Sequence, residues 1–260
     1  MASTRPLQLH GRPVGAGDRP VIITPLVGRT SADIDAELQA ILALRPDMLE
    51  WRVDFFEGIA DSARVITTAR AIQRAAAPVP LLLTRRNSTE GGQPVPIDEA
   101  AVVALLCRVC EARCVDLIDY ELSNAAQDLA RLRAVSAAQG VAMVMSFHDF
   151  QRTPDADTLV GKFVAAEGLG ADIAKVAVMP QNPQDVLTLL DATWRASQSV
   201  AVPLISMSMG GLGAMSRIFG WQYGSAATFA VGKSSSAPGQ IAVEDLRAAL
   251  MTVQRATSGR

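Results

Sequence analysis

Short apolar segments alternate along this chain with longer segments in which apolar residues recur every three or four positions. The short segments have the length and the β-branched content of buried strands, and the longer ones have the period of amphipathic helices. The strands predicted by this pattern are residues 21–28, 48–54, 79–86, 114–122, 141–150, 173–180, 202–209 and 226–232. Their spacing of about 25 to 35 residues is typical of repeated strand–helix units.

The helical pattern is clearest in residues 31–44, 97–113 and 182–197. In the last of these, Asn182 precedes a proline, a pair that commonly caps and opens a helix. Eight strands that alternate with helices predict a closed (β/α)8 barrel, or TIM barrel, with its site at the C-terminal ends of the strands. We expect one domain over residues 1–260, because no linker or change in composition divides the chain.

Residues 7–15 alternate around a glycine before the first predicted strand. This pattern predicts a short β-hairpin that closes the bottom of the barrel, the end opposite to the expected site. His10 belongs to this hairpin, so we expect it to lie far from the chemistry.

The composition narrows the possible partners of the protein. Hydrophobic residues make up 49% of the 260 positions, and the formal net charge is −2, which offers no basic surface for nucleic acid. No apolar segment approaches the roughly 20 residues of a membrane span, and the first 15 residues lack the apolar centre of a signal peptide. We therefore expect a cytoplasmic protein that binds neither nucleic acid nor membranes.

Three cysteines, Cys107, Cys110 and Cys114, lie close together in the sequence. Such a group is also found in metal and redox sites. The first two fall within a predicted amphipathic helix, however, and no histidine lies nearby to complete a ligand set. We therefore expect reduced, buried thiols and no metal.

Alternation along the predicted strands shows which charged residues share a face. In "LEWRVD" (49–54), Glu50, Arg52 and Asp54 fall on one face, opposite to the apolar residues. The outer face of a barrel strand is covered by helices, so we expect the charged face to point into the lumen.

The same reasoning places other polar residues at the ends of later strands. Arg86 ends the strand 79–86, Glu90 follows in a loop next to two glycines, and His148 lies near the end of the strand 141–150. The next strand carries Lys175, so a lysine and an imidazole that titrates near neutrality are expected to approach one another.

Lys175 is one of only three lysines in a chain that has 21 arginines. A buried lysine loses its proton more readily than an exposed one, and a neutral amine attacks carbonyl groups, whereas arginine remains protonated. This reasoning predicts imine chemistry at Lys175, with nearby arginines favouring the neutral amine further. The alternative is a structural ion pair between Lys175 and either Glu50 or Asp54.

Seven separated motifs carry a resemblance to a known family. They are "LEWRVD" (49–54), "TRRNSTEGG" (84–92), "MSFHDF" (145–150), "AKVAVMP" (174–180), "SMSMGGLGAMSR" (206–217), "GSAATF" (224–229) and "SSAPGQI" (235–241). Their order and spacing resemble those of type I 3-dehydroquinate dehydratase, an enzyme of the shikimate pathway, from about residue 20 to the C-terminus. The resemblance implies a barrel, usually a homodimer, that dehydrates 3-dehydroquinate to 3-dehydroshikimate through a lysine imine without metal or cofactor.

The resemblance also implies roles for individual residues. Lys175 is similar to the imine-forming lysine, His148 to the general acid and base, and Glu90 to the carboxylate that orients this histidine. Arg217 corresponds to the arginine that binds the substrate carboxylate. The other implied contacts with the ring, its hydroxyls and the carboxylate are Glu50, Arg52, Arg86, Met207, Met209, Phe229, Ser236 and Gln240.

The chain departs from the family pattern at three places. Pro25 stands where relatives often have a small polar residue, "GGLG" (210–213) replaces a lysine and a threonine, and Phe147 precedes the histidine where asparagine or tyrosine is commoner. None of these departures changes the amine or its acid–base partner.

Two other functions remain open from the sequence alone. A class I aldolase also uses a barrel lysine, but most aldolases bind sugar phosphates after strands 7 and 8, where this chain has "SSSAPGQ" (234–240) and an arginine. A catalytically silent barrel that binds a small acid is the second alternative, against which the retained Lys175, His148 and Glu90 argue.

Overall fold

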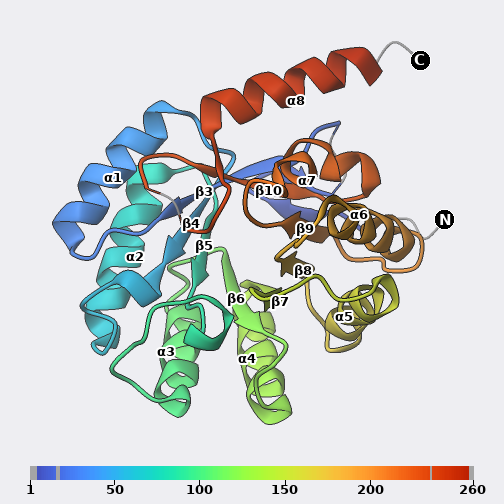
Figure 1. The fold of residues 1–260 in the computed structure, drawn as a ribbon. Coiled ribbons are helices and arrows are strands. Elements are labelled where there is room, and N and C mark those ends of the chain that lie inside the picture. The colour runs from blue at the N-terminus through green and yellow to red at the C-terminus, as the bar shows by residue number, and fades with distance from the viewer. Residues whose placement is uncertain (1–4, 16–17, 235, 258–260) are drawn as a thin grey trace.

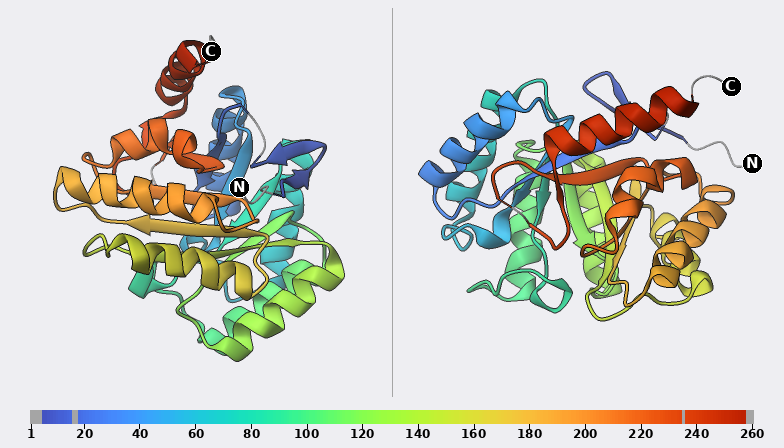
Figure 2. Two further views of the ribbon diagram at one scale, coloured as in Figure 1. Left: turned by 90° about the vertical axis from the view of Figure 1, so that its right-hand side faces the viewer. Right: turned by 45° about the horizontal axis from the view of Figure 1, so that its top comes forward.

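The computed structural model describes residues 5–15, 18–234 and 236–257. A curved parallel sheet forms its centre, and helices cover the outside of this sheet (Figures 1 and 2). The barrel strands are β3 (Val21–Leu26), β4 (Met48–Arg52), β5 (Leu81–Thr84), β6 (Leu117–Glu121), β7 (Ala142–Asp149), β8 (Ile173–Val178), β9 (Leu204–Ser208) and β10 (Ala227–Val231). Each lies within one of the eight predicted segments, so the predicted (β/α)8 barrel is confirmed.

The barrel closes through a contact between β9 and β10. Parallel pairing runs in chain order from β3 to β9, and β10 pairs with β3. Leu204 at the start of β9 forms a bridge with Ser225, and its carbonyl accepts a hydrogen bond of 2.7 Å from the amide of Ala226. The short strand β11 (Ile241–Ala242) pairs with the end of β10, so the segment between these two strands returns to the mouth of the barrel.

Short polar side chains begin several of the outer helices. Over the described residues, the α-helices are α1 (Ser31–Ala43), α2 (Ser62–Ala76), α3 (Glu99–Glu111), α4 (Ala126–Gln139), α5 (Ala156–Gly168), α6 (Pro183–Ser197), α7 (Ala214–Phe219) and α8 (Val243–Thr257). Thr30 forms a capping box with Asp33 at α1, and Asn182 caps α6 as predicted. Among the described residues, no helix is long and apolar enough to cross a membrane.

Alternation along β4 separates the two faces of the barrel wall. Leu49 and Trp51 are fully buried in the apolar layer between the strands and the helices. Glu50 and Arg52 are also buried, but they line the interior of the barrel at its open end. The prediction of a charged lumen face in this segment is confirmed for these two residues.

The predicted hairpin is present and covers the N-terminal end of the barrel. It consists of β1 (Leu7–Leu9) and β2 (Arg12–Val14), which pair in antiparallel orientation. Leu9 and Val14 join an apolar cluster that includes Met48, the first residue of β4. His10 bonds to Asp116, just before β6, at 2.7 Å. Both observations place His10 at the bottom of the barrel, as predicted.

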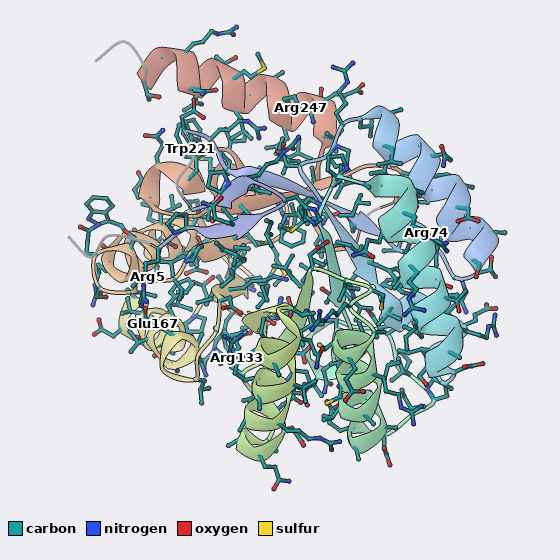
Figure 3. The ribbon with its side chains drawn as sticks, turned by 180° about the vertical axis from the view of Figure 1, so that it is seen from behind. Arg5, Arg74, Arg133, Glu167, Trp221 and Arg247 are labelled. Carbon is teal, nitrogen blue, oxygen red and sulfur yellow. The ribbon has the colours of Figure 1, made fainter. Side chains whose placement is uncertain are left out.

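Hydrogen bonds also join the loops that precede the later strands. Arg5, Glu167 and Arg133 are labelled in the view from behind (Figure 3). The amide of Arg5 donates to the carbonyl of Ala201, whose own amide donates to the carboxylate of Glu167 on α5. Nearby, Arg133 on α4 forms an ion pair with Asp172 at 2.5 Å. These contacts fasten the lower end of the barrel, and the opposite end carries the site.

Each predicted strand segment extends one or two residues past the C-terminal end of the observed strand. β4 ends at Arg52, so Asp54 lies in a 3-10 helix, η1 (Val53–Phe55), and not on the strand as predicted. β5 ends at Thr84, so Arg86 also lies beyond its strand. The apolar and charged alternation continues into these turns, and sequence alone does not show where the backbone pairing stops.

The three cysteines are buried in the layer between barrel and helices. Cys107 and Cys110 lie on α3, and Cys114 lies in the following turn, where its thiol donates to the carbonyl of Val109. All three thiols are free, as the sequence predicts. Within the part of the chain that the structure describes, no three histidine, cysteine, aspartate or glutamate side chains form a group that could hold a metal ion.

Candidate active site

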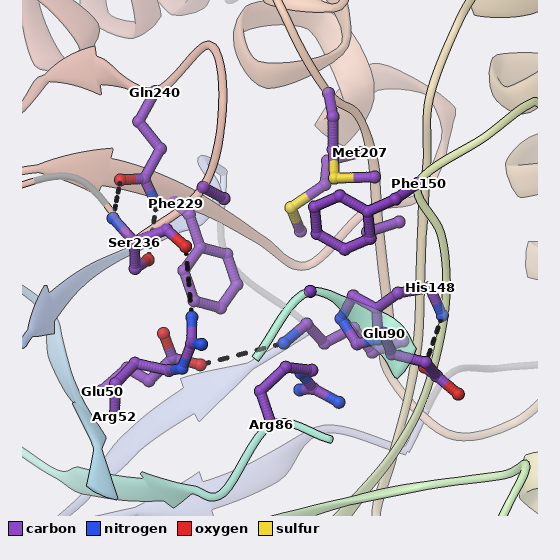
Figure 4. A pocket seen from close by; sticks show the side chains of 15 residues that line it. Glu50, Arg52, Arg86, Glu90, His148, Phe150, Met207, Phe229, Ser236 and Gln240 are labelled. Carbon is purple, nitrogen blue, oxygen red and sulfur yellow. Dashed lines mark hydrogen bonds and ion pairs between the residues drawn. The ribbon is translucent and has the colours of Figure 1, made fainter. Parts of the chain in front are cut away.

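The C-terminal ends of the barrel strands surround a hollow with an empty volume of about 450 Å³ (Figure 4). The predicted residues that line it are Glu50, Arg52, Arg86, Glu90, His148, Lys175, Met207, Met209, Phe229, Ser236 and Gln240. Gly91, Phe150, Ala177 and Ala237 complete the lining. The structure thus brings together all of the predicted site residues except Arg217.

Lys175 projects from β8 into this hollow and is 5% exposed. Its Nζ lies 2.9 Å from Oδ2 of Asp119 and 3.9 Å from Oε1 of Glu50. The ring of Phe229 lies on another side, with its centroid 4.8 Å from Nζ. Glu50 is one of the two ionic partners expected from the sequence, whereas Asp119, the closer carboxylate, is not among them.

Asp119, on β6, is the centre of a fully buried network. Its carboxylate forms ion pairs with Lys175 and with Arg86, the latter at 2.8 Å, and accepts a hydrogen bond of 2.5 Å from Ser146. Burial opposes ionisation, but Arg86 and Lys175 together hold the pKa of Asp119 far below its ordinary value. Asp119 is therefore ionised and fixes the positions of two cationic side chains in the site.

Arg86 also contacts a second carboxylate on the same strand. Its Nη1 lies 2.8 Å from Glu121, and despite burial the charges of Asp119 and Glu121 raise the pKa of Arg86. The segment "LIDYE" that forms β6 did contain the signal for this pair. Asp119 and Glu121 alternate there just as Glu50 and Arg52 do on β4, so the same face argument could have found them.

Arg52 and Glu50 are held by different partners near the end of β4. Arg52 forms a two-point ion pair with Asp54, with distances of 2.8 and 2.7 Å. Glu50 accepts a hydrogen bond of 2.9 Å from the hydroxyl of Thr84 on β5. Asp54 is thus the partner of Arg52, and the predicted alternative in which Asp54 pairs with Lys175 is wrong.

His148 and Glu90 form a close pair on one side of the hollow (Figure 4). Oε2 of Glu90 accepts hydrogen bonds from the backbone amide and from Nδ1 of His148, both at 2.9 Å. An ionised Glu90 can only accept, so this contact assigns the proton to Nδ1 and leaves Nε2 as the basic nitrogen. The geometry suits a carboxylate that orients a histidine base.

The electrostatic surroundings favour the neutral form of this histidine. Burial, together with the positive charges of Arg86 and Lys175, lowers the pKa of His148 well below its ordinary value. His148 is therefore uncharged at neutral pH and can accept a proton there.

The turn that carries Glu90 depends on glycine. Glu90 ends a 3-10 helix, η2 (Ser88–Glu90), and Gly91 follows with a left-handed backbone (φ 83°). A Cβ atom on Gly91 would lie 2.2 Å from the ring of Phe150. The absence of a side chain thus lets Phe150 pack over this turn and line the hollow beside His148.

The segment between β10 and β11 covers another side of the hollow. Ser235 lies outside the described residues. The side-chain amide of Gln240 accepts from the amide of Ser236 and donates to its hydroxyl, each at 3.1 Å. Arg52 donates to the carbonyl of Ser236 at 3.1 Å. Ser236 and Gln240 therefore lie on a loop that reaches the site, and Arg52, itself a residue of the site, helps to hold this loop in place.

Arg217, on α7, is almost completely buried and does not line the hollow. Its guanidinium donates to the carbonyls of Phe229, on β10, and Pro238, in the segment between β10 and β11. Within the described residues its Nε has no hydrogen-bond partner. Burial without a neighbouring carboxylate lowers the pKa of Arg217 to about 10. The predicted contact with a substrate carboxylate stays a prediction.

Comparison with known proteins identifies the family. A model of the type I 3-dehydroquinase family matches residues 22–257. The chain belongs to the type I 3-dehydroquinase family. It is 51% identical over 256 residues to a 3-dehydroquinate dehydratase of Albidiferax ferrireducens, covering 98% of this chain and 97% of that one. It is 48% identical to the Aromatoleum aromaticum protein of the same name, with both chains fully covered.

Solved structures of type I 3-dehydroquinases have the same fold. The 3-dehydroquinate dehydratase of Geobacillus kaustophilus superimposes with a TM-score of 0.96 at 44% identity, covering 98% of this chain and 99% of that one. The type I enzyme of Clostridium difficile, described as carrying covalently modified comenic acid, gives a TM-score of 0.93 at 35% identity, with 97% and 99% covered. The family resemblance found in the seven sequence motifs is confirmed.

Proposed function

We propose that this chain removes water from 3-dehydroquinate to give 3-dehydroshikimate through an imine on Lys175. Membership of the type I 3-dehydroquinase family supports the reaction and its Schiff-base course. The observation that carries the assignment of residues is the position of Lys175 in one hollow with the His148–Glu90 pair. A nucleophilic amine beside an oriented, uncharged imidazole provides the groups that imine formation and proton abstraction require.

In the first stage, the Nζ of Lys175 attacks the ring ketone to form a carbinolamine. Loss of water from this intermediate gives an iminium. Nε2 of His148 takes protons from the lysine nitrogen and passes them to the departing oxygen: two of the three ammonium protons leave in the water and the third stays on the iminium nitrogen. The iminium withdraws electrons from the neighbouring carbon and so acidifies its C–H bond. Asp119, which pairs with Lys175 in the free protein, compensates the positive charge that the iminium retains.

In the second stage, Nε2 of His148 removes the acidified proton and Glu90 holds the imidazolium that results. The electrons pass to the imine nitrogen as an enamine, and their return expels the hydroxyl group, which takes the proton from His148. Hydrolysis of the product imine then consumes the water that imine formation released. The balance of the whole sequence is the loss of one water molecule from the substrate.

Other residues of the hollow provide binding and orientation. Met207, Met209 and Phe229 offer an apolar wall for the ring. The polar contacts proposed for the hydroxyls and the carboxylate are Glu50, Arg52, Arg86, Arg217, Ser236 and Gln240. A substrate carboxylate is the partner that we propose for the Nε of Arg217.

An assay of the purified protein against two substrate classes tests the proposed function. With 3-dehydroquinate we expect turnover to a conjugated enone, followed by its ultraviolet absorbance, and with sugar phosphates we expect no carbon–carbon cleavage. Cleavage of a sugar phosphate would instead support the class I aldolase. Binding of 3-dehydroquinate without any turnover would support the silent barrel.

The homodimer implied by the family resemblance belongs to the same proposal. Leu187 and Trp194, seven positions apart on one face of α6, are both exposed, as is Met215 on the adjacent α7. Large apolar side chains gathered on neighbouring helices are typical of a protein interface, and a second copy of the chain is the proposed partner.

Light scattering during gel filtration measures the oligomeric state. We expect the wild-type protein to elute with the mass of two chains and Trp194→Glu to shift toward the mass of one, because a buried unpaired charge opposes association. Leu169→Glu replaces an equally exposed residue after α5 and is expected to leave the mass unchanged. A wild-type monomer, or the same shift in both variants, would contradict the proposed interface.

A further inference from the structure

The two carboxylate oxygens of Glu90 bind different partners. Oε2 holds His148, as described above, and Oε1 accepts a hydrogen bond of 2.5 Å from the hydroxyl of Ser123. This distance is typical of a hydroxyl that donates to an ionised carboxylate. Ser123 does not line the hollow, so it reaches Glu90 from outside the substrate site. No sequence motif drew attention to this residue, because a single serine in a turn carries no signal.

Backbone contacts fix the turn that carries Ser123, between β6 and α4. The amide of Leu122 donates to the carbonyl of Ser146 at 2.8 Å, which continues the pairing of β6 with β7. The side-chain amide of Asn124 donates to Oε2 of Glu121 at 3.0 Å. Leu122 and Asn124, the residues on either side of Ser123, are both anchored by these hydrogen bonds. The backbone of the turn therefore holds the Ser123 hydroxyl close to Glu90.

We propose that Ser123 is a positioning residue for the dehydration: its hydroxyl keeps Glu90 ionised and oriented so that Glu90 accepts the Nδ1 proton of His148. Nε2 of His148 then remains the basic atom toward the substrate. The inference rests on the proposed function, in which His148 acts as the base. Ser123 itself touches neither substrate nor the reacting atoms and acts only through Glu90.

The charges around Glu90 explain why this hydrogen bond matters. Burial raises the pKa of Glu90, and the Ser123 hydroxyl is the strongest of the contacts that lower it again. The other groups that face Glu90 are Arg86 and the backbone amide of His148, which lower its pKa, and Glu121, which raises it. Without the hydroxyl, Glu90 takes up a proton at higher pH and then no longer accepts the Nδ1 proton of His148.

The dependence of kcat on pH tests this role. In Ser123→Ala we expect the acid limb of the profile to move to higher pH by about half to one unit, because one hydrogen bond to the charged form is lost. Activity at alkaline pH, where Glu90 is ionised in both proteins, should change much less. Ser123→Thr keeps the hydroxyl and is expected to restore the wild-type limb. Ser123 is exposed, so both variants should fold normally.

Ser88→Ala is the matched control, because it removes the same atom from an exposed serine two residues before Glu90. We expect its profile to coincide with that of the wild type. An unmoved acid limb in Ser123→Ala, or a loss of activity that is equal at every pH, would overturn the positioning role while leaving the dehydratase function intact. If the wild-type protein itself shows no dehydration, the proposed function fails and not this inference alone.

Discussion

Lys175→Ala should abolish turnover of 3-dehydroquinate, with a loss of at least about 10⁴-fold, because no other amine lines the described part of the hollow. Sodium borohydride reduces an imine to a stable secondary amine. In the wild-type protein we therefore expect borohydride with 3-dehydroquinate to inactivate the enzyme and to add a reduced ligand to the peptide that contains Lys175. Mass spectrometry of the digested protein measures both effects, and Lys175→Ala should show no added mass.

This variant is expected to fold, because Asp119 keeps Arg86 and Ser146 as partners when the lysine is removed. Lys162→Ala is the matched control. Lys162 is on α5, and its ammonium lies over the ring of Phe147 and not in the hollow. Its turnover and its labelling should equal those of the wild type. Labelling at Lys162 or Lys233 would falsify the assignment of the imine to Lys175. Lys175 would then have only a structural role, as the ionic partner of Asp119.

His148→Ala should separate imine formation from proton abstraction. The lysine is still present, so borohydride should still trap the ligand on Lys175, at a lower rate. Turnover should fall by roughly 10²–10⁴-fold, the usual range for removal of a general acid or base. Single-turnover trapping and steady-state assays on the same preparation measure the two steps.

His10→Ala provides the control for this prediction, because His10 is the other histidine of the chain and lies at the opposite end of the barrel. We expect its turnover to be unchanged. Near-normal turnover in His148→Ala would exclude the histidine as the base. Loss of trapping together with turnover would mean that His148 is needed already for imine formation.

The agreement between sequence and structure is best along the strands. Alternation in "LEWRVD" identified the lumen face of β4 correctly for Glu50 and Arg52, because residues two apart on a strand share a side whatever the rest of the fold does. The helix cap at Asn182 could be predicted for a similar reason, because the side chain of a cap residue binds a backbone amide only three positions further along the chain. The family motifs then supplied residues, such as Ser236 and Gln240, that alternation could not have selected.

Contacts between strands were predicted less well. Glu121, Ser146 and Lys175 stand side by side because β6, β7 and β8 pair in that register. Register depends on how the barrel closes, and a pattern of period two is the same for every shift by two residues. The sequence therefore named the lysine and did not identify Asp119 as its nearest carboxylate.

By itself, then, the sequence determined the repeated strand–helix units, the barrel, the bottom hairpin, the family, and eleven of the residues that surround the hollow. Only the tertiary structure decided that Asp119 joins Lys175 to Arg86, that Arg217 donates to the carbonyls of Phe229 and Pro238, and that Ser123 donates to Glu90. The physical reason is the distance along the sequence over which each kind of interaction acts. Strand alternation and helix caps act over a few neighbouring residues, whereas Lys175 and Asp119 are 56 positions apart and meet only when the barrel closes.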